Sequence, residues 1–121
     1  MNSGDWDDAF APAAGADRRV HTRRVLQTAA TLRIPGGKTV EVRTLDISAG
    51  GMAILVPSGP PTGATFTVCT ALPMKAKPHA PIEVRAQVMH SVYSGALGGF
   101  KVGLRFIDLG DDTLATIEAF L

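Results

Sequence analysis

Apolar and polar residues alternate along most of the chain from Leu26 onward, and this period of two predicts half-buried β-strands. In the clearest run, apolar side chains at 82, 84, 86 and 88 are separated by Glu83, Arg85 and Gln87. Gly and Pro residues between the runs indicate turns. The segment Gly51–Val56 is instead a short, continuously apolar run, which predicts a buried strand. In all, six strands are predicted, over Leu26–Ile34, Thr39–Leu45, Gly51–Val56, Thr65–Leu72, Ile82–Ser91 and Phe100–Ile107. The fold class is therefore all-β, either a small antiparallel barrel or a sandwich.

The two ends of the chain break this pattern. Apolar residues recur at helical spacing after the acidic pair that follows Gly110, which predicts a short amphipathic helix over Asp111–Leu121. Acidic residues in a first helical turn favour the helix dipole. Residues 1–17 are rich in Ala, Gly and Asp, and we expect them to form a disordered acidic tail.

Composition narrows the class of protein. The chain has 121 residues, of which 45% are hydrophobic, and this length suits one domain. No stretch approaches the roughly 18 consecutive apolar residues of a membrane helix, so no membrane span is expected. Cys69 is the single cysteine, which fits a reducing cytoplasm. With one Cys and three His, no structural zinc site is expected, and no metal or resident cofactor is predicted.

The formal net charge of +1 conceals a strong segregation of charge. Residues 1–17 carry a net −4 and residues 18–43 a net +6, while 44–107 carry +3 and 108–121 carry −4. A basic block this concentrated favours an anionic partner. A solvated basic strand face, neutralised by the acidic tail, would give the same pattern, and charge alone does not separate the two interpretations.

The basic block begins with Arg18-Arg19-Val20-His21-Thr22-Arg23-Arg24. Arg19 and Arg23 are four residues apart, a spacing that puts both guanidinium groups on one side of either a helix or an extended segment. Two such groups could hold phosphates bidentately or bind the O6 and N7 edge of guanine. A solvated linker with incidental charge is the alternative.

A second candidate lies between two predicted strands, in Asp46-Ile47-Ser48-Ala49-Gly50-Gly51. Asp46 and Ser48 would point the same way in an extended segment. The carboxylate could accept hydrogen bonds from the N1–H and N2–H₂ edge of guanine, and the glycines allow close backbone approach. A tight hairpin turn, in which Asp and Ser bond to the local backbone, is the alternative.

Taken together, these two segments resemble the signature of the PilZ domain, a bacterial receptor domain for cyclic di-GMP. The family pattern is RRxxxR followed, a few tens of residues later, by DxSxxG, matched here at Arg18, Arg19 and Arg23 and then at Asp46, Ser48 and Gly51. Further along, Pro61-Thr62-Gly63 and the strand Gly99–Phe106 are also similar to the family. The resemblance covers roughly residues 18–110 and implies a six-stranded antiparallel β-barrel with a short C-terminal helix.

The resemblance also implies a domain layout. An arm at 18–25 would bind the ligand, 26–110 would form the barrel and 111–121 the helix. Arg18, Arg19 and Arg23 would bind the phosphates and guanine faces of cyclic di-GMP. The guanine base would contact Asp46 and Ser48, and Gly51 would keep the backbone close. In the family, an arginine at the place of Arg18 is linked to binding of a ligand pair.

These observations predict a cytoplasmic, single-domain cyclic di-GMP receptor, with motility or biofilm formation as possible outputs. The arm would be mobile without ligand and would fold onto the Asp46–Gly51 turn, altering the surface shown to an unidentified effector protein. A ligand-independent PilZ adaptor for pilus or motility machinery is the alternative. A small barrel that binds RNA or single-stranded DNA is disfavoured, because aromatic residues are only 6% of the chain. The sequence contains no recognisable catalytic set, so we do not expect an enzyme.

Overall fold

The computed structural model describes residues 22–75 and 79–121. The predicted tail at 1–17, together with Arg18 and Arg19, lies outside the described residues. The elements are β1 (Arg24–Val25), β2 (Ala29–Arg33), β3 (Thr39–Ile47), β4 (Gly51–Val56), β5 (Thr65–Leu72), β6 (Ala80–Ser94), β7 (Gly99–Ile107) and α2 (Asp111–Phe120).

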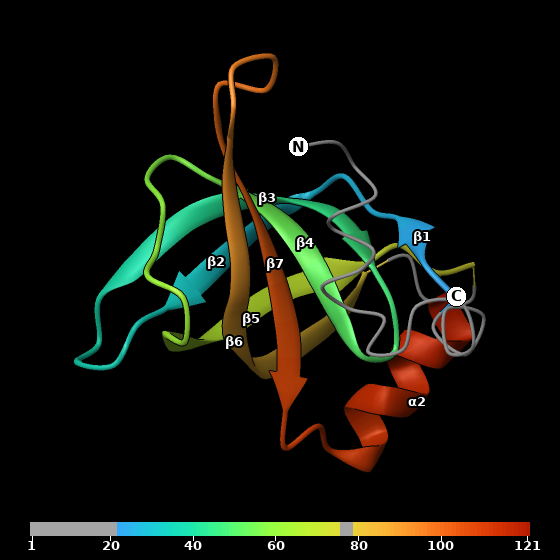
Figure 1. Ribbon diagram of the computed structural model, residues 1–121. Helices are drawn as coiled ribbons and strands as arrows, with labels where there is room; N and C mark the ends of the chain where they lie inside the picture. Colours follow the sequence, from blue (N-terminus) through green and yellow to red (C-terminus); the bar gives the residue numbers. More distant parts are fainter. Residues whose placement is uncertain (1–21, 76–78) are drawn as a thin grey trace, which may run out of the picture.

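The strands close into an antiparallel barrel (Figure 1). Neighbours follow the order β3, β2, β5, β6, β7 and β4, and β4 pairs back with β3 to complete the circle. Closure removes the two exposed edges that an open sheet would leave. The predicted six-stranded barrel with a C-terminal helix is therefore confirmed, and β1 is a short additional strand on β3.

The barrel interior is filled by the apolar positions of the alternating runs. Along β6, every second residue from Ala80 to Val88 is buried, whereas Glu83 and Arg85 face solvent. Val102 and Leu104 of β7 are fully buried beside them. α2 packs on β6 and buries Ile117 and Phe120 in the core, as its helical spacing predicts.

The first predicted strand, Leu26–Ile34, differs from the observed structure. Residues 24–33 do run along β3, but three of them (26–28) face only two residues of β3 (44–45), which interrupts the ladder between β1 and β2. The Oγ1 of Thr44 fills the interruption by donating a hydrogen bond to the carbonyl of Leu26 and accepting one from the Thr28 N–H at 3.0 Å. A side chain thus replaces a backbone partner, which the alternation pattern does not reveal.

The last two strands are longer than predicted and form a hairpin that projects from the barrel (Figure 1). A β-bulge between Val88 and His90 shifts the register of β6 against β7. Extra residues of this kind increase local twist and redirect a strand. Within the described part of the chain, no helix has the length and apolar character needed to cross a membrane.

Candidate functional site

The structure brings the two candidate segments into contact. The guanidinium of Arg23 forms an ion pair with the carboxylate of Asp46, which lies near the end of β3. Their side chains are 18% and 29% exposed, so the pair lies at the surface but is partly shielded from water. A partly buried pair is screened less by salt than a fully exposed one. Residues that are 23 positions apart in the chain therefore form one charged site.

Backbone pairing holds the C-terminal part of the arm beside this site. Arg24 pairs with Ile47 and Val25 with Asp46, which forms β1. The Leu26 N–H also donates to the Leu45 carbonyl at 3.0 Å. Backbone pairing and the Arg23 ion pair thus attach residues 23–25 to β3, whereas the expected mobility of the arm without ligand stays a prediction. Residues 18–21 lie outside the described part of the chain.

Ser48 occupies the turn between β3 and β4 and is fully buried. Its Oγ accepts hydrogen bonds from the N–H groups of Gly50 and Gly51 at 3.3 and 3.2 Å, and donates to the Gly51 carbonyl at 3.1 Å. The expectation that Asp46 and Ser48 share one exposed face is not met, because β3 ends at Ile47 and Ser48 turns inward. The hydroxyl shapes the hairpin on whose strand Asp46 lies.

Thr44 is a residue of this region that the sequence reasoning missed. It is 1% exposed and accepts and donates hydrogen bonds that fix the arm where the ladder is interrupted. The Thr44 N–H adds a third link by donating to the Thr28 carbonyl at 2.9 Å. One signal in the sequence could have identified Thr44. It is a polar residue at a position of β3 where the alternation predicts an apolar one.

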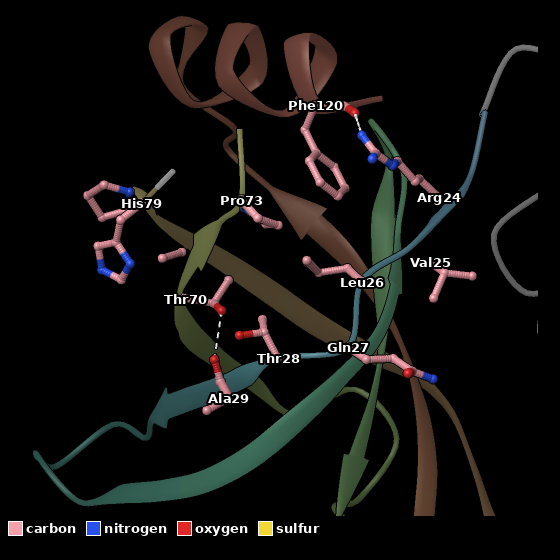
Figure 2. A pocket seen from close by; sticks show the side chains of 12 residues that line it. Arg24, Val25, Leu26, Gln27, Thr28, Ala29, Thr70, Pro73, His79 and Phe120 are labelled. Atoms are coloured by element: carbon pink, nitrogen blue, oxygen red, sulfur yellow. Dashed lines mark hydrogen bonds between the residues drawn. The ribbon is translucent and has the colours of Figure 1, made fainter. Parts of the chain in front are cut away.

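Arg24 was also missed as a contact residue, and its side chain reaches the C-terminal helix (Figure 2). Its guanidinium donates to the carbonyl of Phe120 and lies over the Phe120 ring, 4.2 Å from the ring centroid. A cation at a helix C-terminus satisfies an orphan carbonyl and favours the helix dipole. Adjacent arginines thus connect the arm to two different elements, β3 and α2.

The fold and the two motifs agree with a comparison against protein families. The family model described as the PilZ domain matches residues 17–121 of the chain. The chain belongs to the PilZ domain family. Arg18, Arg19, Arg23, Asp46, Ser48 and Gly51 all fall within the matched residues.

One relative with sequence similarity is the flagellar brake protein YcgR of Xanthomonas campestris pv. campestris. It is 32% identical over 90 residues, which are 71% of this chain but 34% of that protein. The chain therefore spans about a third of the length of that relative.

Two solved structures share the fold. Bacillus subtilis MotI (DgrA), an inhibitor of motility, aligns over 80% of this chain and 46% of its own, with a TM-score of 0.69 at 17% identity. The PilZ domain of Escherichia coli YcgR, solved with cyclic di-GMP, aligns over 84% of this chain and 87% of its own, with a TM-score of 0.61 at 18% identity. The architecture is therefore shared at low sequence identity.

The PilZ domain also contains a cavity of about 660 Å³ beside the arm (Figure 2). Residues Arg24–Ala29 form one wall, and the end of β5, the start of β6 and Phe120 form the others. Figure 2 shows Thr70 of β5 bonded across it to the Ala29 carbonyl, at 2.8 Å. Among the predicted site residues that the structure describes, Arg23, Asp46, Ser48 and Gly51, none lines this cavity, so the Arg23–Asp46 pair is separate from it.

Proposed function

We propose that this PilZ domain is a cytoplasmic receptor for cyclic di-GMP that regulates a partner protein and has no catalytic activity of its own. The observation that carries the proposal is the contact between Arg23 and Asp46, which joins the arginine motif to the DxSxxG motif at a partly exposed site. Membership in the PilZ family supports it, as does the E. coli YcgR domain solved with this ligand.

The ligand would use the site by exchanging partners. A phosphate of cyclic di-GMP competes with the Asp46 carboxylate for the Arg23 guanidinium, since arginine binds both groups in a bidentate manner. Asp46 is then released to accept hydrogen bonds from the N1–H and N2–H₂ groups of a guanine. Two opposite charges in the free protein thereby become two recognition groups for one ligand.

Other residues of the two motifs would complete the site. Arg18 and Arg19 supply further positive charge from the segment that precedes Thr22, and this segment closes over the ligand. Ser48 and Gly51 take part by holding the turn beside Asp46, with Ser48 contacting the base only if the turn opens. Since β1 already pairs with β3, the ordering that accompanies binding is confined to the residues before it, and it alters the surface offered to an effector protein.

Calorimetric titration with cyclic di-GMP tests the receptor function, with cyclic di-AMP as the control ligand. We expect saturable binding of cyclic di-GMP alone, with a stoichiometry that distinguishes one bound molecule from a pair. Charge-assisted hydrogen bonds contribute roughly 1.5–3 kcal/mol each, so Arg19→Ala or Asp46→Asn should weaken binding by about 10- to 100-fold.

Asp108→Asn is the matched control for Asp46→Asn, because Asp108 also pairs with an arginine, Arg85, but at an exposed place on the barrel. The Asp108 variant should bind as the wild type does. Absence of binding to wild-type protein at ligand concentrations far above cellular levels would contradict the receptor function and favour the ligand-independent adaptor.

A further inference from the structure

The β6–β7 hairpin leaves part of one strand edge without a neighbour. β4 accompanies β7 as far as the pair between Val56 and Phe100. On the other side, β5 pairs with β6 only as far as the partner of Thr65, Gln87. β6 continues to Ser94, and its end stands clear of the barrel (Figure 1).

Two backbone hydrogen bonds at Val88 are the last that another segment of the described chain makes to the outer edge of β6. The Val88 N–H donates to the Ala64 carbonyl, and its carbonyl accepts from the Gly63 N–H, each at 2.8 Å. Among residues 22–75 and 79–121, no strand pairing and no backbone hydrogen bond reaches the outer edge over Ser91–Ser94. This edge therefore presents backbone donors and acceptors in the arrangement that another strand would need.

Exposed apolar side chains gather on the same hairpin. The described residues include four exposed large hydrophobic side chains, and three of them are Met89, Tyr93 and Leu97, which are 39%, 62% and 47% exposed. Tyr93 is held by an edge-to-face contact with Phe100, with ring centroids 5.4 Å apart. Side chains that are exposed, apolar and confined to one projecting element indicate a contact surface.

The lack of charged residues on this hairpin indicates which partner the β6 edge would bind. No Lys, Arg, Asp or Glu occurs from Gln87 to Phe100, although such residues are common elsewhere in the barrel strands. Monomeric proteins usually protect an open edge with charged residues or proline, and this edge has neither. If two copies of one strand pair antiparallel, each charge near the twofold axis meets a like charge. An uncharged strand avoids that repulsion.

We propose that the outer edge of β6, over Ser91–Ser94, binds the same edge of a second copy of this chain. The two strands pair antiparallel about a twofold axis and join the two barrels by a continuous ladder, with Tyr93 and Leu97 covering its sides. The bulge at Met89 ends the ladder. The edge is short, so association is expected to be weak and dependent on protein concentration. The inference does not depend on ligand binding.

Sedimentation velocity over a range of protein concentrations tests the proposal. The wild-type chain should pass from monomer to dimer as concentration rises, and no further. The double variant Val92→Lys/Tyr93→Lys sets two lysines opposite each other, since positions 92 and 93 face each other across the twofold axis, and should weaken dimerisation by at least about 10-fold, because like charges opposite each other destabilise paired strands. Val25→Lys is the matched control: Val25, the fourth exposed apolar residue, is 69% exposed and lies outside the hairpin, so dimerisation should be unchanged.

A wild-type chain that stays monomeric at all concentrations would overturn the proposal. So would a dimer that the double variant leaves intact, or one that Val25→Lys weakens equally. Hydrogen exchange on the wild-type protein keeps the proposal testable if the double variant fails to fold. Backbone N–H groups of Ser91–Ser94 should exchange more slowly in concentrated than in dilute solution, and equal rates in both would contradict edge pairing.

Discussion

The β3–β4 and β6–β7 hairpins contain the same local hydrogen bond in opposite surroundings. In the first, the Ser48 Oγ accepts from the Gly51 N–H at 3.2 Å, and in the second the Ser94 Oγ accepts from the Leu97 N–H at 3.3 Å. Ser48 is fully buried and follows Ile47, which pairs with Arg24 of the arm, whereas Leu97 at the other tip is exposed. The comparison teaches that burial and attached elements, and not the turn bond itself, determine what a hairpin contributes.

The largest expected effect on stability is at Thr44 of β3, whose hydroxyl bonds to the backbone of Leu26 and Thr28. Thr44→Val removes the partner of the Leu26 carbonyl and of the Thr28 N–H, and a buried unsatisfied group costs roughly 1–3 kcal/mol. We expect the free energy of unfolding to fall by about 2–4 kcal/mol, measured by urea denaturation.

Thr70→Val is the control for Thr44→Val, since the Thr70 hydroxyl also donates to a backbone carbonyl, that of Ala29, but in an exposed place. Its cost should stay below about 0.5 kcal/mol. Equal losses for the two variants would show that burial does not set the energy of these bonds.

Ser48 and Ser94, one serine in each hairpin turn, test this comparison directly. Ser48→Ala should lower the free energy of unfolding by about 1–2 kcal/mol, because buried N–H groups lose an acceptor while the Ser48 backbone bond to Gly51 remains. Ser94→Ala should cost less than about 0.5 kcal/mol. Thermal unfolding of both variants measures the difference, and similar melting temperatures would break the comparison.

Arg24→Ala tests how the arm stabilises the C-terminal helix. Its loss removes a hydrogen bond to the Phe120 carbonyl and a cation–π contact, and should destabilise the protein by about 1 kcal/mol. Hydrogen exchange in the last turn of α2 should increase more than exchange in the barrel. Unchanged exchange at α2 would show that the contact does not stabilise the helix.

The smallest effect concerns Cys69 of β5, which lies apart from both hairpins. Burial raises the pKa of its thiol; nearby Glu83 raises it further and Arg33 lowers it. Thiolate is the reactive form, so alkylation near pH 8 should be slower than for free cysteine, and its rate should still rise where the free thiol has levelled off. A rate profile that matches free cysteine would contradict this. The same profile in the Ser48 and Ser94 variants would show that the barrel is unperturbed.

The sequence was a good guide where one physical rule decides the structure. The apolar pattern predicted all six barrel strands, as a continuous apolar run at Gly51–Val56, and the helical spacing predicted α2, because the pattern follows which side chains an element buries. The interruption at 26–28 could not be predicted, because there a side-chain hydroxyl of Thr44 takes the place of a backbone partner. The extra length of β6 was missed because its last residues do not face the core.

For the site, the motifs predicted that Arg23 and Asp46 belong together but not how they meet. Their ion pair depends on the register of β1 against β3, which is set by pairing between distant segments. The inward turn of Ser48 follows from β3 ending at Ile47, and strand ends are among the least predictable features of a sequence. Arg24 was missed because its partner, Phe120, lies 96 residues away in the chain.

Calorimetric titration of cyclic di-GMP into Arg23→Ala and Arg33→Ala tests the central claim most directly. Both arginines form an ion pair, Arg23 with Asp46 and Arg33 with Glu83, but only Arg23 lies at the proposed site. We predict that Arg23→Ala weakens binding by about 10- to 100-fold and that Arg33→Ala leaves it unchanged. Equal affinities for wild type and Arg23→Ala, in a chain that binds the ligand, would place the binding site elsewhere on the barrel.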